Sequence, residues 1–306
     1  MSRQVHVDVD PGSDDAVMLA LALASPAIDL TGVSTVGGNS TIDNTTHNAL
    51  SILELFDRTD VPVARGCGSP IVGSFETVEW IHGPDGIRGD LPEPTATPID
   101  AHGAEFIVEQ ARDHGGDLTI VAVGPMTNLA TALILEPELP EMVDDIYLMG
   151  GAAMTTGNAT PMAEANFRND AVAARRVVQS GRPRMVGLDA THDTTVPVSW
   201  IEEYAGADPR RDAIAAWLDY PSEVMELGSE SDPAIHDAAV AAHLIDDGVL
   251  SFEPYHLDVD ATGGPSNGAT ICDRWGVTGA EPNAEVAVAA DTERFRAVLA
   301  DAFDRL

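Results

Sequence analysis

The feature that most restricts the fold of this 306-residue chain is an alternation of short β-rich runs with longer helical patterns. We expect strands at Val5–Val9, Leu30–Val36, Leu118–Val123, Ile146–Met149 and Arg184–Leu188, and helices at Asp14–Ala24, at Thr41–Phe56 and from Gly124-Pro125 through Leu135. Strand–loop–helix repetition is typical of an open, mostly parallel sheet with helices on both faces. The predicted fold class is therefore α/β.

Composition limits the organisation and the partners of this fold. Apolar residues make up 44% of the chain, and neither an internal repeat nor a low-complexity linker interrupts it, so residues 1–306 are predicted to form a single domain. The region Val198–Pro233 is expected to be mainly helical and to form a flap. The net charge is −34, and every basic residue is an arginine. A field of this sign repels nucleic acid and anionic membranes, so neither is expected as a partner.

The same composition suggests a compartment. The excess of carboxylates is typical of a halophilic protein, because a salty cytoplasm screens most of the self-repulsion. The two cysteines, Cys67 and Cys272, do not form a disulfide framework, and no apolar stretch reaches membrane-spanning length. The acidic residues begin at Asp8, which leaves no room for a signal peptide. We therefore expect a soluble, cytoplasmic protein.

Polar residues follow the predicted strands where those strands end. Asp10, Asn39, Thr127-Asn128 and Asp189 each occupy such a position. In open parallel sheets, ligands bind at the carboxyl ends of the strands. A binding site is therefore expected at this edge of the sheet, with Asn128 interpreted as a helix-start residue and Asp189 as support for the site.

The first of these positions belongs to an unusually acidic run, Asp8-Val9-Asp10-Pro11-Gly12-Ser13-Asp14-Asp15. Ca²⁺ requires six to eight oxygen ligands, and carboxylates in one turn can supply several. Helix capping alone would explain Asp14 or Asp15, but explains Asp8 and Asp10 less well. An EF-hand is excluded, because its pattern requires Gly at Ser13. A haloacid-dehalogenase-like phosphatase also begins with a D-x-D pair, but that family normally uses a later lysine and this chain has none.

The acidic run resembles the N-terminal signature of the inosine–uridine-preferring nucleoside hydrolases. Further matches follow in that family's order: Gly37-Gly38-Asn39, His82-Gly83-Pro84-Asp85-Gly86, Val123–Leu129, Met149-Gly150-Gly151, Gly157-Asn158, Ala163–Phe167, Gly187–Thr191 and His236-Asp237-Ala238. The resemblance implies a Rossmann-like nucleoside hydrolase fold and Ca²⁺-dependent hydrolysis of ribonucleosides to ribose and free base, as in purine and pyrimidine salvage. It also implies a homodimer or homotetramer.

The resemblance also assigns roles to residues. Ca²⁺ would be bound by the carboxylates of Asp10, Asp15 and Asp237 and by the main-chain carbonyl of Thr127. Asp14, Asn39 and Asn166 would bind the ribose 2′- and 3′-hydroxyls, Asn158 and Glu164 the 5′-hydroxyl, and Met149 would line the sugar pocket. The segment between Met149 and Asn158 is one residue longer than the family's pattern.

The chemistry of N-glycosidic cleavage fits these roles. Positive charge develops on the ribose in the transition state, and nearby carboxylates stabilise it. Asp10 is expected to act as general base on a metal-bound water. The leaving base departs more readily when it is protonated, and His236 is the first candidate for the proton donor, with His82 the second. A catalytically silent nucleoside- or ribose-binding protein on the same scaffold is the alternative, and the sequence does not predict which base is preferred.

Overall fold

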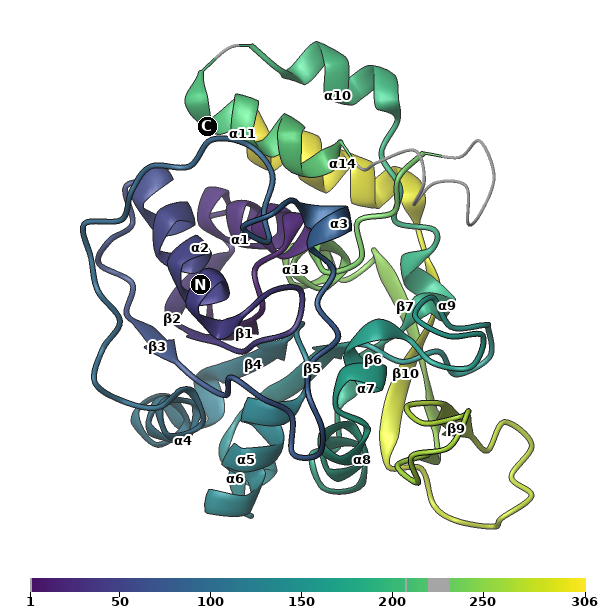
Figure 1. The fold of residues 1–306 in the computed structure, drawn as a ribbon. Helices are drawn as coiled ribbons and strands as arrows, with labels where there is room; N and C mark the ends of the chain where they lie inside the picture. The colour runs from purple at the N-terminus through teal and green to yellow at the C-terminus, as the bar shows by residue number, and fades with distance from the viewer. Residues whose placement is uncertain (1, 207, 220–231) are drawn as a thin grey trace.

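A twisted eight-stranded sheet forms the centre of the computed structural model, which describes residues 2–206, 208–219 and 232–306. Figure 1 shows its strands in the order β3 (Val63–Arg65), β2 (Ile28–Thr35), β1 (Arg3–Val9), β4 (Leu118–Ala122), β5 (Asp145–Met149), β6 (Arg184–Val186), β10 (Ala284–Ala290) and β7 (Leu250–Tyr255). All neighbouring pairs are parallel except β10 and β7. The predicted α/β class with a mostly parallel sheet is confirmed.

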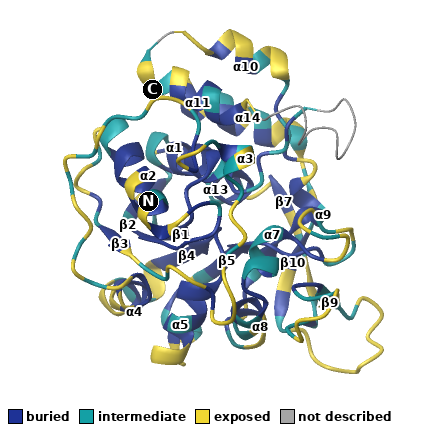
Figure 2. Cartoon of the chain, in the orientation of Figure 1, coloured by how far each residue is buried: buried dark blue, intermediate teal, exposed yellow. Residues whose placement is uncertain are grey.

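Helices cover both faces of this sheet. One face packs against α1 (Ser13–Ala24), α2 (Ile42–Leu55), α10 (Val198–Tyr204), α11 (Pro209–Leu218), α13 (Ala238–Ile245) and α14 (Thr292–Phe303), and the other against α4 (Gly103–His114), α5 (Thr127–Leu135) and α8 (Ala171–Ser180). Successive residues of β4 divide between the two cores, because side chains alternate along a strand: Val121 joins the first, and Ile120 and Ala122 the second. Figure 2 shows the buried residues concentrated in the strands and in α1 and α13.

Short elements complete the chain around the sheet. They are the helices α3 (Glu79–His82), α6 (Leu139–Met142), α7 (Ala165–Asn169) and α9 (Leu188–Thr191), the 3₁₀ turn η1 (Gly115–Asp117), and a separate antiparallel pair, β8 (Leu257–Val259) and β9 (Thr270–Cys272). Among them, α3, α7 and α9 lie in or beside loops that leave the carboxyl ends of the strands. These loops surround the edge at which the sequence predicts a site.

Two sequence expectations need comment. The strand expected at Arg184–Leu188 ends at Val186, because Gly187 caps α9 and the Leu188 N–H donates to the Gly151 carbonyl, 3.0 Å away. The flap expected over residues 198–233 is helical where it is described, in α10 and α11, and residues 220–231 lie outside the described part of the chain.

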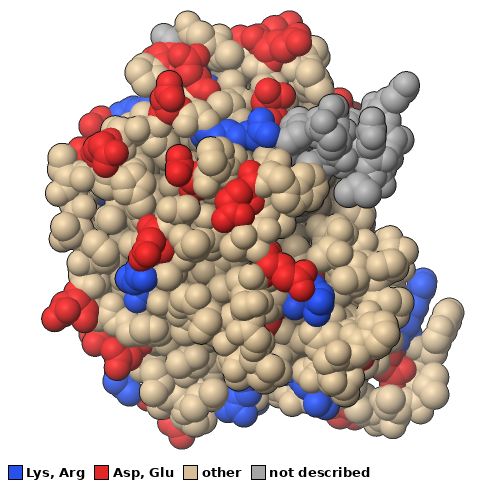
Figure 3. Space-filling model, in the orientation of Figure 1, with Lys and Arg blue, Asp and Glu red and all other residues tan. Residues whose placement is uncertain are grey.

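The surface carries the charge that the composition predicts. Figure 3 shows carboxylates spread over one face of the molecule, with several arginine side chains beside them. Some contacts are bidentate, as between Arg175 and Asp258 at 2.8 and 3.0 Å. Such exposed pairs each contribute little to stability and weaken with salt. Within the described residues, no helix has the length and apolarity needed to cross a membrane.

Candidate metal and substrate site

Three carboxylates from distant parts of the chain meet at the carboxyl edge of the sheet. Asp14 and Asp15 lie in the first turn of α1, and Asp237 immediately precedes α13. One carboxylate oxygen from each lies within 4.8 Å of the other two. Asp10, the first residue after β1, adjoins them, and its N–H donates to Asp15 Oδ1 at 3.1 Å. The structure therefore brings together the four acidic residues that the sequence assigned to this site.

The turn from β1 into α1 fixes the Asp15 carboxylate. The Gly12 N–H donates to Asp15 Oδ2 at 3.0 Å, so Asp15 caps the helix from its third position. The Asn39 side-chain amide donates to the same oxygen at 3.1 Å. A Cβ at Gly12 would lie 2.7 Å from Asn39 Nδ2, which explains why a glycine occupies this turn.

Hydrogen bonds also fix the Asp10 carboxylate, although Asp10 lies outside any helix or strand. The Asn39 N–H donates to Asp10 Oδ2 at 2.7 Å, and the Asn39 side chain donates to the Asp10 main-chain oxygen at 3.2 Å. Two glycines leave room for the carboxylate, since a Cβ at Gly124 would lie 2.7 Å from Asp10 Oδ1 and one at Gly38 would overlap Asp10 Oδ2. Only 2% of Asp10 is exposed, so its orientation is determined by the protein rather than by solvent.

The electrostatics of this cluster favour a cation. Burial, followed by mutual repulsion, raises the pKa of Asp15 to about 7 and the pKa values of Asp10 and Asp237 well above the usual range. Among the residues that the structure describes, no arginine forms an ion pair with any of these carboxylates. Buried charges of one sign require a counter-charge, and carboxylate oxygens are ligands for hard divalent cations. The donor set fits Ca²⁺.

The residues expected to bind ribose lie beside the cluster. Asn39 contacts both Asp10 and Asp15, as described above. Asn166, at the start of α7, donates its amide to the main-chain oxygens of Val123 at 2.6 Å and Met149 at 3.2 Å. It therefore lies across the carboxyl ends of β4 and β5, where Met149 is the last residue of its strand. Asp14 is half-buried, so its carboxylate remains accessible.

Glu164 and Asn158 occupy the loop that leaves β5. Glu164 is 2% exposed, and its carboxylate accepts from the N–H groups of Gly151 at 2.8 Å, Asn166 at 2.8 Å and Phe167 at 3.1 Å. Burial raises its pKa despite these bonds. Asn158 is exposed, and its side-chain oxygen accepts from the Ala165 N–H at 3.0 Å. Glu164 thus holds the loop to the start of α7, and Asn158 lies at the outer rim.

Thr127, which is expected to supply a main-chain ligand, is the first residue of α5. The Thr127 main-chain oxygen accepts from the Thr131 hydroxyl at 2.7 Å, one turn further along α5, so this carbonyl is directed along the helix. Its side chain donates to Asp170 Oδ2 at 2.8 Å. The Val123 carbonyl accepts from the Asn166 amide, and Val123 directly precedes Gly124 beside Asp10.

Both candidate histidines border the cluster. The Ser13 N–H donates to His82 Nδ1 at 3.1 Å, and the Thr191 hydroxyl lies 2.8 Å from His236 Nδ1. Burial lowers the pKa of His236 to about 4 and also lowers that of His82, while the Asp14 carboxylate opposes the lowering in both. His236 also meets the ring of His192, with centroids 6.1 Å apart. Both histidines therefore lie near Asp14, and burial disfavours their charged forms.

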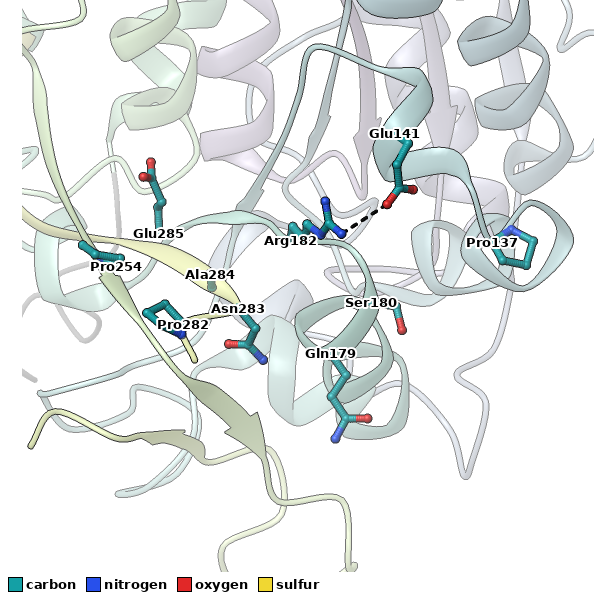
Figure 4. A pocket seen from close by; sticks show the side chains of 10 residues that line it. All are labelled: Pro137, Glu141, Gln179, Ser180, Arg182, Pro254, Pro282, Asn283, Ala284 and Glu285. Carbon is teal, nitrogen blue, oxygen red and sulfur yellow. Dashed lines mark ion pairs between the residues drawn. The ribbon is translucent and has the colours of Figure 1, made fainter. Parts of the chain in front are cut away.

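Two surface pockets have linings that include none of the clustered carboxylates Asp10, Asp14, Asp15 and Asp237. One, of about 470 Å³, is found at the opposite edge of the sheet, where β6 and β10 begin, and Figure 4 shows its Arg182 directed toward Glu141, 3.3 Å away. The other, of about 400 Å³, includes Asp189 and His192 and so adjoins the site through His236. The Asp189 carboxylate accepts from two N–H groups of the loop after β5, as expected for a supporting residue.

Comparison with known proteins gives a consistent result. Residues 5–297 match the family described as inosine-uridine preferring nucleoside hydrolase. The pyrimidine-specific ribonucleoside hydrolase RihA of Escherichia coli O8 is 37% identical over 98% of each chain. Among solved structures, the purine-preferring ribonucleoside hydrolase from Gardnerella vaginalis superposes with a TM-score of 0.91 at 29% identity, covering 98% of both chains. The plant nucleoside hydrolase PpNRh1 gives 0.90 at 28% identity and 99% coverage of both.

Proposed function

Since the chain belongs to the inosine–uridine preferring nucleoside hydrolase family and is a nucleoside hydrolase, we propose that it cleaves ribonucleosides to ribose and free base with Ca²⁺ bound by Asp10, Asp15 and Asp237. The observation that carries the proposal is the buried carboxylate cluster, which has no ion-paired arginine in the described chain. The main-chain carbonyl of Thr127 completes the protein ligands. Thr127 begins α5 three residues after Gly124, which adjoins the Asp10 carboxylate.

Each side chain then has a task in the reaction. Bound Ca²⁺ would supply orientation for the ribose diol and the attacking water and would make that water more acidic. Asp10 accepts the proton of the water, since the Asn39 N–H fixes the orientation of its carboxylate. Asp14, Asn39 and Asn166 bind the 2′- and 3′-hydroxyls, and Met149 lines the sugar pocket. Asn158 and Glu164 bind the 5′-hydroxyl.

The leaving base requires a proton or a hydrogen bond. His236 is the first candidate, because it directly precedes the ligand Asp237. His82 is the second: its Nδ1 accepts from the Ser13 N–H, so in the neutral ring the proton is on Nε2. Replacing each by alanine separates the two, since loss of the donor lowers kcat most for the substrates with the poorest leaving bases.

The activity test is release of free base from inosine, uridine, cytidine and adenosine in molar KCl, with Ca²⁺ or with EGTA. The panel is needed because the relatives include both pyrimidine-specific and purine-preferring enzymes. We expect Ca²⁺-dependent turnover that Asp10→Asn abolishes, whereas Asp29→Asn, on the exposed face of β2, leaves it unchanged. Activity that persists without divalent cations would contradict the calcium assignment. Ribose protection against heat without any turnover would support the silent binding protein instead.

Two further properties belong to the proposal. We expect a homodimer or homotetramer, which the native mass in solution measures. We also expect activity and stability to rise from low salt to molar KCl, because the net charge of −34 is then screened. This salt dependence is what the carboxylate-rich surface in Figure 3 predicts for a halophilic enzyme.

A further inference from the structure

A further buried carboxylate, that of Asp8, lies next to the catalytic edge but takes no part in the cluster. Asp8 is fully buried in β1, and its side chain faces the same core as α4 and α5. Its Oδ1 accepts from the Ser34 hydroxyl at 2.6 Å and from the side-chain amide of Asn128 at 2.8 Å. Asp8 therefore contacts the start of α5 rather than the cluster.

Asn128 is the centre of this arrangement. Its Nδ2 donates to Asp8 Oδ1 and also to the main-chain oxygen of Thr35 at 2.9 Å, while its Oδ1 accepts from the Cys67 N–H at 2.9 Å. One fully buried amide thus joins β1, the end of β2 and the turn after β3 to α5. The amide has little freedom to move, since a Cβ at Gly66 would overlap its side chain.

The strand end that Asn128 holds leads directly to the catalytic carboxylates. Thr35 is the last residue of β2, and the Gly37 N–H donates to the Cys67 carbonyl at 2.9 Å. Asn39 follows two residues later and fixes Asp10 through its N–H and Asp15 through its amide. Asn128 is therefore hydrogen-bonded to Thr35, where residues 35–39 begin, and to Cys67, whose carbonyl accepts from Gly37 in the middle of them.

We propose that Asn128 is a positioning residue for the reaction, which holds the Thr35–Asn39 segment so that Asn39 meets Asp10 and Asp15. Asn128 touches neither substrate nor metal in this role, and Asp8 supplies the acceptor that orients its amide. The inference rests on the proposed Ca²⁺-dependent hydrolysis, and it goes beyond that proposal by assigning a task to two residues outside the cluster. Outer hydrogen-bond partners of metal ligands typically change metal affinity by about 10- to 100-fold when replaced.

A donor–acceptor exchange tests this role. Asn128→Asp keeps the acceptor for the Cys67 N–H but removes the amide donor, and places two carboxylates in contact. The double variant Asp8→Asn/Asn128→Asp restores one donor and one acceptor with their positions exchanged. Ser34→Ala is the matched control, because it removes a bond to Asp8 Oδ1 of similar length without touching Asn128. The measurements are Ca²⁺ titration calorimetry, kcat and KM, and the thermal midpoint.

We expect Asn128→Asp to weaken Ca²⁺ binding and lower kcat by about tenfold or more, and the double variant to recover a substantial part of both. Ser34→Ala should lower only the thermal midpoint. Wild-type Ca²⁺ affinity and kcat in folded Asn128→Asp would overturn the positioning role, while leaving the proposed function intact. If Asn128→Asp does not fold, the double variant is the test. A double variant that fails to fold, or that folds without affinity for Ca²⁺, also overturns the positioning role. A wild-type protein that neither binds Ca²⁺ nor releases base would overturn the proposed function itself.

Discussion

The buried Glu164 side chain joins the loop after β5 to the start of α7, and replacing it by alanine tests how much that contact stabilises the protein. The carboxylate accepts from three main-chain N–H groups, two in the first turn of α7 and one at Gly151. Alanine leaves all three donors without their acceptor in a position that is 2% exposed. The loss therefore affects the loop and the helix start together.

The magnitude follows from those three bonds. A buried donor left unsatisfied costs about 1–3 kcal/mol, and loss of a helix N-cap costs about 1 kcal/mol, which overlaps with two of the bonds. Alanine also removes a carboxylate whose raised pKa shows that burial opposes its charge, which returns part of the loss. We expect Glu164→Ala to lower the free energy of unfolding by about 3 kcal/mol, or the thermal midpoint by about 6 °C.

Denaturant unfolding followed by circular dichroism measures this change. Glu93→Ala is the matched control, because the Glu93 side chain is 92% exposed, and it should stay within about 0.5 kcal/mol of wild type. Glu164→Gln should fall between wild type and alanine, since its amide can accept at one position but opposes an N–H at the other. A loss below about 1 kcal/mol for Glu164→Ala would refute the reasoning that these bonds hold the loop.

Three further predictions concern the site and the sheet beneath it. Asp237→Asn removes one ligand charge and should weaken Ca²⁺ binding more than about tenfold by calorimetry. Gly38→Ala places a Cβ against the Asp10 carboxylate and should lower kcat/KM by about 100-fold. Burial lowers the pKa of His6 from 6.5 to about 3, so between these pH values only the unfolded chain binds the proton. The free energy of unfolding therefore falls as the pH is lowered below 6.5. His6→Gln, which can keep a bond to Ser34, should reduce the loss of unfolding free energy between pH 8 and pH 5 by about 2 kcal/mol.

Each of these predictions has a control and a contrary outcome. Asp29→Asn, at an exposed position, should leave Ca²⁺ affinity unchanged, and an unaltered affinity for Asp237→Asn would remove Asp237 from the ligand set. Gly264→Ala meets no atom closer than 3.9 Å and should retain activity. If Gly38→Ala retains it too, close packing of the Asp10 carboxylate is unimportant. An equal loss of stability on acidification in wild type and His6→Gln would show that His6 does not cause it.

The sequence predicted the parallel sheet because the pattern of apolar residues follows local geometry. Alternation around Val5–Val9 and a helical period after Asp14 need no long-range information, and both elements form as expected. It missed the end of β6, since Gly187 stops that strand through a bond to Gly151, which belongs to a different loop. Element types were thus readable from neighbours in the sequence, whereas this boundary depended on a tertiary contact.

The same contrast between local patterns and tertiary contacts applies to the residues of the site. Asp10, Asp14 and Asp15 lie within one turn, so their proximity follows from the sequence alone. The main-chain ligand does not follow from the spacing, because the direction of carbonyl groups at the start of α5 depends on where that helix begins. Asn128 looked like an ordinary helix-start residue, and its contact with Asp8, 120 residues earlier, is visible only in the folded chain.

The place of β1 in the sheet has a consequence for how the protein is made. β1 precedes its sheet neighbour β4 by more than a hundred residues, and the acidic cluster closes only when Asp237 arrives with α13. Long-range pairings of this kind form late, because chain closure must precede them. A nascent chain therefore carries Asp10, Asp14 and Asp15 without Asp237 during most of its synthesis. The proposed ion would meet its full set of carboxylates only at the end of folding.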